Sequence, residues 1–247
     1  MTLRFLGGRL AIPARGLAAL AASGVLAGCG SSAAKPSATI TPTRAQAVIY
    51  AHAVNLQPSD LPGMTATRSE QEVAPSQATP VQTCAGVGNL APPITKTDSA
   101  KFTAISGAQH EEIASNVEVM PTTTIAAQKN AAEQSARAIS CVERLILPKL
   151  NAASGSSVHF GHATVTRLPN ALPGVEGTIG FRIEAPVLGV PTAIEPSQPT
   201  FYIDAFAFLS GPAEVSMVAT AFPNPVPPQT ERRLLDLLHR RALAAQL

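Results

Sequence analysis

The sequence has no tryptophan, only two tyrosines, and few charged residues, which make up 14% of its 247 positions. So few aromatic rings weaken any case for a site that stacks against sugars. The eighteen Lys and Arg residues barely outnumber the sixteen Asp and Glu residues, whereas binding to nucleic acid requires concentrated basic charge. The composition therefore argues against a carbohydrate or nucleic-acid partner.

Catalytic and metal-binding motifs with the required spacing are also lacking. A Gly-x-Ser-x-Gly nucleophile elbow does not occur. The glycine pair Gly86 and Gly88 imitates a dinucleotide fingerprint, but two prolines follow where a helix would have to begin. His159 and His162 are three residues apart, so on a strand they converge only if Gly161 makes a bulge. We predict no catalytic residue, no metal site and no cofactor.

What is present at the start of the chain is typical of an exported protein. Three arginines give it a positive charge: Arg4, Arg9 and Arg15. The small, apolar stretch 16–25 that follows is too short to cross a bilayer as a permanent helix. It ends in Leu26-Ala27-Gly28-Cys29, which resembles the bacterial lipobox. This resemblance implies that Cys29 receives a diacylglyceryl group and becomes the new N-terminus.

The lipobox defines the expected organisation of the rest. Residues 1–28 are a predicted lipoprotein signal peptide, and acyl chains on Cys29 (palmitate among them) would hold the protein on the extracytoplasmic face of the cell membrane. The alternative is ordinary secretion with Cys29 incidental. Residues 29–43 are the lipidated cysteine and a Gly-, Ser-, Ala- and Pro-rich tether. We expect one domain over residues 44–247. Without the three leader arginines, fifteen basic residues face sixteen acidic ones, a net charge of −1.

Two cysteines remain after Cys29, and an even pair in an exported protein is most simply a disulfide. We therefore predict a bond between Cys84 and Cys141. Metal binding by two isolated thiols is the weaker alternative.

Helical spacing of apolar residues predicts three helices. The first covers residues 44–55, with Thr43 as a possible cap. The longest pattern covers residues 122–147, where Thr122 or Thr123 can cap the helix and Pro148 ends or kinks it. The last helix begins after Thr230 and places four leucines on its inner side: Leu234, Leu235, Leu237 and Leu238.

Alternating and continuous apolar stretches predict strands between these helices. The prolines of 75–93 argue for an irregular loop there. The predicted strands cover residues 64–73, 101–106, 111–120, 158–168, 174–185, 200–209 and 214–222. Runs of antiparallel strands between packed helices predict an α+β fold, with the sheet packed against the long central helix and the terminal helices.

One polar group interrupts the apolar strand 200–209. Asp204 needs a partner if its face of the sheet is covered, and Arg182 on a neighbouring strand is the candidate. Tyr202 lies on the same face. A structural ion pair is one interpretation, and a ligand-binding group formed by Tyr202, Asp204 and Arg182 is the other.

The mature chain resembles actinobacterial envelope lipoproteins that are similar to the extracellular sensor domains of Ser/Thr receptor kinases and to the Mog1/PsbP-like sandwich. The likeness runs from about Arg44 to Leu247 and lies in the lipobox, Cys84, Cys141 and several short motifs. These motifs are Asp60-Leu61-Pro62-Gly63, Gly174-Val-Glu-Gly177 before Phe181-Arg182, Tyr202-Ile-Asp204, Gly211-Pro-Ala-Glu214-Val and Glu231-Arg-Arg-Leu-Leu. The resemblance implies a Mog1/PsbP-like sandwich that binds something in a cleft.

Three functions follow as hypotheses. The first is a non-enzymatic, membrane-anchored module that binds a lipid, another small envelope molecule or an envelope protein, with its cleft between the apolar sheet face and the central helix. The second is a structural accessory of envelope complexes. The third is a hydrolase with an unfamiliar site at His159, His162 and Asp204.

Overall fold

The computed structural model describes residues 41–68, 70–73, 80–154, 159–168, 172–175, 177–188 and 199–247. The predicted signal peptide, Cys29 and most of the predicted tether lie outside the described residues.

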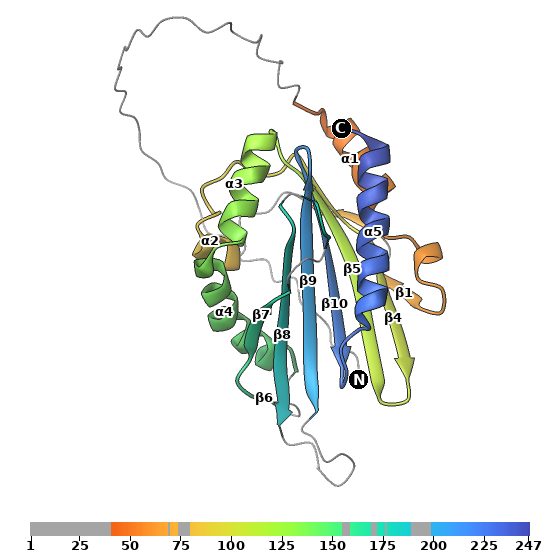
Figure 1. Cartoon of the computed structure of the whole chain (residues 1–247), viewed down its shortest axis with the longest axis vertical. Coiled ribbons are helices and arrows are strands. Elements are labelled where there is room, and N and C mark those ends of the chain that lie inside the picture. Colours follow the sequence, from red (N-terminus) through yellow and green to blue (C-terminus); the bar gives the residue numbers. More distant parts are fainter. Residues whose placement is uncertain are drawn as a thin grey trace, which may run out of the picture.

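A large antiparallel sheet forms the centre of the molecule (Figure 1). Its order is β1-β4-β5-β10-β9-β8-β6; β3 pairs with β5 and with β2, and β7 pairs with β8. The long central strands are β5, Gln109–Val119; β8, Ile179–Leu188; β9, Thr200–Ser210; and β10, Ala213–Phe222. The shorter strands are β1, Thr65–Arg68; β2, Gln71–Val73; β3, Thr95–Asp98; β4, Lys101–Ser106; β6, His159–Phe160; and β7, Thr164–Arg167.

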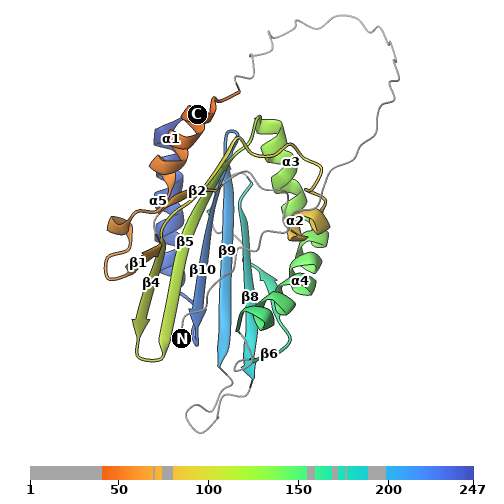
Figure 2. The same cartoon turned by 180° about the vertical axis from the view of Figure 1, so that it is seen from behind.

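Helices cover the two faces of this sheet unequally. On one face α1, Arg44–Val54, packs beside α5, Pro228–Ala245 (Figure 1). On the other, α3, Thr123–Glu133, and α4, Ala136–Ser154, lie over the β7–β10 end together with the short α2, Pro80–Ala85. Among the residues that the structure describes, Figure 2 shows no helix in front of β4 and β5 on this second face. The predicted α+β fold, with an antiparallel sheet between helices, is confirmed.

The alternation of side chains along the strands produces two cores. Phe206 and Phe208 of β9 point to the α1 and α5 side, where the larger core lies. Ile203 points to the other face and packs in a second cluster that includes Leu150 of α4. Successive residues of a strand face opposite sides, so one apolar strand serves both cores.

The predicted central helix is in fact two helices. The break falls at Gln134 and Ser135, between α3 and α4. Thr122 caps α3 as predicted, by accepting a hydrogen bond from the Ile125 amide. Ser135 then accepts one from the Ala138 amide at the start of α4. The prediction of one helix was wrong because the apolar stripe continues across this cap.

Helix α4 also continues beyond Pro148 to Ser154. The missing proline N–H removes one helical hydrogen bond, but Leu150 is buried in the second core. We infer that this packing holds the end of the helix in place. Of the two alternatives predicted for Pro148, an end or a kink of the helix, the end is therefore wrong.

Several other boundaries differ from the prediction. Helix α2 lies inside the predicted irregular loop, where Ala85 packs against Ala138 of α4. Helix α5 begins at Pro228, ahead of Thr230, because proline suits the first helical position. Three of its four leucines are buried, and Leu237 is half-buried.

The strand boundaries differ in a similar way. The expected strands 64–73 and 158–168 are each divided into two, as β1 with β2 and as β6 with β7. Strand β8 starts at Ile179, later than expected, and β3 was not predicted.

Candidate functional site

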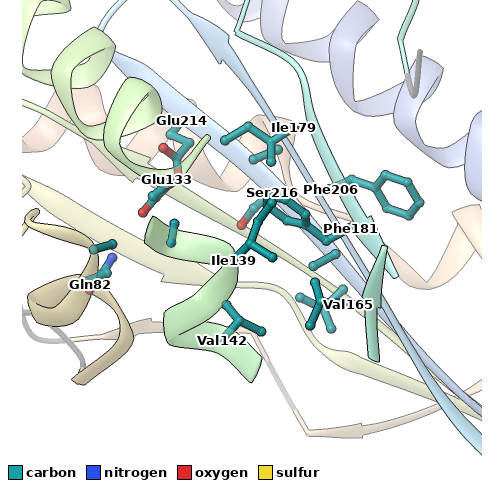
Figure 3. Close-up of a pocket in the computed structure, with 15 residues that line it drawn as sticks. Gln82, Glu133, Ile139, Val142, Val165, Ile179, Phe181, Phe206, Glu214 and Ser216 are labelled. Carbon is teal, nitrogen blue, oxygen red and sulfur yellow. The ribbon is translucent and has the colours of Figure 1, made fainter. Parts of the chain in front are cut away.

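A largely apolar cavity of about 200 Å³ lies between the sheet and helices α2, α3 and α4. Figure 3 shows Ile139 and Val142 of α4 with Phe181 of β8 and Val165 of β7 among the side chains that line it. Val218 of β10 also lines the cavity and is 41% exposed, so the cavity opens to solvent beside this residue. The cleft that the sequence predicted between the sheet and the central helical segment is present.

Four charged side chains meet at one end of the cavity. Glu118 of β5 and Glu214 of β10 lie directly opposite each other in the sheet. Lys129 of α3 reaches down to both, and its Nζ lies 2.5 Å from Glu214 Oε1 and 3.3 Å from Glu118 Oε2. Glu133, one helical turn further along α3, is 3.1 Å from the same Nζ. Lysine has three N–H donors, so these three carboxylates account for all of them.

A second lysine joins this group from the edge of the sheet. Lys96 of β3 is opposite Glu118 in the register, and its Nζ lies 2.5 Å from Glu118 Oε1. Lys96 and Lys129 therefore face three carboxylates. If every group is ionised, the cluster carries one excess negative charge.

The environment shifts the pKa values of this group in different directions. Burial raises the pKa of Glu214 to about 8, and the negative charges of Glu133 and Glu118 add to the rise while Lys129 opposes it. Burial alone would raise the pKa of Glu118 and lower that of Lys129. Lys129 and Lys96 nevertheless hold the pKa of Glu118 below its ordinary value, and the carboxylates hold that of Lys129 above its ordinary value. Glu214 is therefore the group that keeps a proton at neutral pH.

Glu214 also has an oxygen without a partner. Its side chain is almost fully buried, and its Oε2 makes no hydrogen bond to any described residue. An unsatisfied buried polar atom costs about 1–3 kcal/mol. Figure 3 shows the Glu214 and Glu133 side chains at the same end of the cavity, and both line it. The site thus combines an apolar chamber with a carboxyl group that lacks a partner.

The predicted disulfide forms part of the structure around the cavity. Cys84 of α2 and Cys141 of α4 are bonded, with an S–S distance of 2.07 Å. Gln82 and Ala85 of α2 line the cavity on either side of Cys84 in the sequence. The bond therefore attaches α2 to α4 in the wall of the site.

The three residues proposed from sequence as a ligand-binding group meet on the opposite face of the sheet, under α5. Arg182 donates two hydrogen bonds to Asp204, at 2.7 and 2.8 Å, so the predicted ion pair is confirmed. The Arg182 guanidinium carbon lies 5.7 Å from the centre of the Tyr202 ring, within the range of a cation–π contact. A ligand-binding role for Tyr202, Asp204 and Arg182 stays a prediction.

Glu231 of α5 completes this second polar group. Burial raises its pKa to about 9, and a hydrogen bond with Asp204 and the negative charge of Asp204 add to the rise, while Arg182 opposes it. Only 5% of Glu231 is exposed. Two carboxyl groups that share a hydrogen bond need one proton between them, and the raised pKa assigns that proton to Glu231.

The hypothetical hydrolase site is not assembled. His159 pairs with Leu188 at one end of β8, whereas Asp204 pairs with Arg182, six residues along the same strand. At roughly 3.3 Å per residue this separates them by about 20 Å. His159 and His162 are exposed, while Asp204 is buried. No metal-binding group of His, Cys, Asp or Glu was found among the described residues.

The sequence analysis missed the polar end of the cavity. Glu118 and Glu214 are each flanked by apolar residues, and this is the signal that could have marked them as inward-facing carboxylates. Lys129 and Glu133 have the i, i+4 spacing of a helical ion pair.

Comparisons with known proteins identify neither a family nor a curated relative: no family matches the sequence, and no curated protein matches it. Two solved structures are similar at the level of the fold. The extracellular domain of PknH from Mycobacterium tuberculosis has a TM-score of 0.43 and 8% identity, with 82% of this chain and 98% of that chain covered. A putative uncharacterized protein from Mycobacterium smegmatis has a TM-score of 0.33 and 13% identity, with 79% and 95% covered.

The chain is thus similar to an actinobacterial extracellular domain, as the sequence resemblance implied. At these TM-scores no residue and no role is transferred from either structure. None of the helices in the described ranges is long and apolar enough to cross a membrane.

Proposed function

We propose that this chain is a membrane-anchored, extracytoplasmic lipoprotein that binds a small molecule of the cell envelope without transforming it. The observation that carries the proposal is the cavity beneath α4, with its apolar lining and the unpartnered carboxyl oxygen of Glu214. A concave, mostly apolar pocket with a few convergent polar groups is the usual form of a small-molecule site.

The size of the cavity limits what it can hold. A cavity of about 150 Å³ is large enough for benzene, whereas sites for drug-sized ligands measure about 300–1,000 Å³. At about 200 Å³, this cavity suits one ring or a short alkyl segment. A longer lipid would have to leave through the mouth beside Val218 and extend over the uncovered face of β5.

The extracytoplasmic location is proposed on the lipobox at Cys29 and is supported by the disulfide, because such bonds persist in oxidising compartments. Acyl chains bind membranes firmly when two or more are present. We expect the protein to fractionate with membranes and a Cys29→Ala variant to lose this association. A wild-type protein that stays in the aqueous phase, with its first residues still attached, would contradict the anchor.

The non-enzymatic part of the proposal is supported by the pairing of the charged groups at the cavity. Lys129 forms one ion pair with Glu118 and another with Glu133. We therefore assign this end of the cavity to recognition.

A cavity-filling variant tests the site. Ala205 of β9 lines the cavity, so Ala205→Phe should fill it, while Ala244→Phe on the exposed side of α5 is a matched control. Native mass spectrometry of protein taken from its own membrane should show a bound small molecule in the wild type and the control and none in Ala205→Phe. No bound molecule in the wild type, or equal occupancy in all three proteins, would count against the site. Crosslinking to one dominant protein, with no small molecule, would favour the structural-accessory hypothesis.

A further inference from the structure

If the cavity binds a small molecule, as proposed above, the charged residues at its polar end select the charge of that molecule. An anionic ligand would need a free hydrogen-bond donor, but Lys129 already has three carboxylate partners, and Lys96 is 2.5 Å from Glu118. The group that lacks a partner is Glu214 Oε2, which becomes a hydrogen-bond acceptor when Glu214 is ionised. With Glu214 protonated the cluster is neutral, so an anion placed here would give it an excess negative charge, offset only by the neutral O–H donor of Glu214.

We propose that the cavity binds a cationic amphiphile: a protonated amine that pairs with Glu214 and Glu133, carried by an apolar ring or short chain that fills the space beneath α4. The ammonium would donate a charge-assisted hydrogen bond to the unpartnered Glu214 oxygen. With it in place, three positive groups would face three carboxylates. The apolar part would contact Ile139, Val142 and Phe181 (Figure 3).

Charge balance in the empty site supports this class of ligand. Three carboxylates facing two lysines are neutral overall only if one carboxyl group holds a proton. Glu214 is that group, because burial and the neighbouring Glu118 and Glu133 raise its pKa to about 8 against the opposing effect of Lys129. A bound ammonium takes the place of this proton, which is released to solvent. Binding of the amine therefore strengthens as the pH rises toward the pKa of Glu214.

Two probes of nearly the same shape test the charge preference. Benzylamine and benzyl alcohol each combine one ring with one polar group, but only benzylamine is a cation at neutral pH. We expect calorimetry or ligand-observed NMR on the intact protein at about pH 8 to show benzylamine binding at least tenfold more tightly than benzyl alcohol. Between about pH 6 and about pH 8 the affinity for benzylamine should rise at least tenfold, while that for benzyl alcohol stays constant.

Substitutions of Glu214 and Glu133 test whether these two carboxyl groups cause the preference for benzylamine. Glu214→Gln keeps the shape of the protonated carboxyl group, so it should fold, and it should remove both the preference for benzylamine and its pH dependence. Glu133→Gln, at the more exposed carboxylate, should weaken benzylamine binding and leave benzyl alcohol unaffected. The matched control is Glu112→Gln: Glu112 of β5 pairs with Lys101 on the same sheet face, at 2.6 Å, and does not line the cavity.

The outcomes separate this inference from the proposed function. Equal binding of the two probes, or tighter binding of benzyl alcohol, would overturn the cationic ligand and leave the cavity as a binding site. An unchanged preference for benzylamine in Glu214→Gln and Glu133→Gln alike would also overturn it, because the cation would then bind elsewhere. If neither probe binds at millimolar concentration and benzene does not bind either, the proposed function fails and this inference fails with it.

Discussion

Replacing Glu231 by glutamine should make the stability of the protein less dependent on pH. Glu231 lies between α5 and the sheet, where Asp204 and Arg182 face it, and its pKa is raised to about 9. In an unfolded chain the ordinary value is 4.5. A group whose pKa is raised by folding stabilises the fold fully below its unfolded pKa and loses this contribution as the pH rises through its folded pKa. The wild-type protein should therefore become less stable between these two values.

The size of this loss of stability follows from the number of protons that the folded protein binds and the unfolded chain does not. One proton bound in the folded state and absent from the unfolded state changes the free energy of unfolding by about 1.4 kcal/mol per pH unit. Between about pH 6 and about pH 8, Glu231 alone should cost the wild-type protein roughly 2–3 kcal/mol. Glutamine has the shape of the protonated carboxyl group and does not titrate, so Glu231→Gln should remove the part of the pH-dependent loss of stability that Glu231 causes. Burial also raises the pKa of Glu214, to about 8. Glu214 therefore adds its own loss of stability with rising pH, in the wild type and in Glu231→Gln alike.

Urea unfolding followed by far-UV circular dichroism is the suitable assay, since the chain has no tryptophan to report by fluorescence. Curves at about pH 6, 7 and 8 for the wild type, Glu231→Gln and the control Asp236→Asn on the same helix give the three slopes directly. The control should follow the wild type. If Glu231→Gln loses as much stability per pH unit as the wild type, Glu231 is ionised in the folded protein and the reasoning about its proton is wrong.

Three further predictions concern the disulfide, the buried lysine and one glycine. Serine at both Cys84 and Cys141, which are 57 residues apart, should lower the free energy of unfolding by about 4 kcal/mol in the chain-entropy model; an unchanged urea midpoint would contradict this. Lys129→Met leaves buried carboxylates without their cation and should cost about 3–5 kcal/mol at neutral pH, with partial recovery at acidic pH as the measurement that identifies the cause. Gly180→Ala should cost about 1–3 kcal/mol by thermal unfolding, because the new Cβ would lie 2.8 Å from the Leu168 carbonyl oxygen; a melting temperature equal to that of the wild type would refute the clash.

The part of the fold that could be predicted depends on local patterns. Asp204 lies in an apolar strand and needs a partner if it is buried, and this predicted an ion pair with Arg182 that the structure confirms. The even cysteine count predicted the disulfide. The first inference needs only the cost of burying an unpaired charge, and the second only the chemistry of an oxidising compartment.

The candidate site depends on pairings between distant segments, and these could not be read from the sequence. Glu118 and Glu214 are neighbours only because β5 and β10 pair in one particular register, and Lys129 meets them only because α3 docks above that pair. Glu231 owes its raised pKa to the position of α5 over Asp204. Local patterning does not determine register between distant strands or the docking of helices. The Ser135 cap, by contrast, was a local signal that the long apolar stripe concealed.

Because a disulfide joins α2 to α4, the shape of the cavity depends on whether the protein is in an oxidising or a reducing compartment. Helix α2 has only six residues, too few to persist by itself in water, and its residues Gln82 and Ala85 complete the wall opposite the strands. With both thiols reduced, as in the cytosol, this segment would be tied down by side-chain packing alone and the chamber would stand partly open. If the protein is exported as proposed, a newly made chain would therefore acquire its finished pocket only after it has left the cytosol and its two thiols have been oxidised.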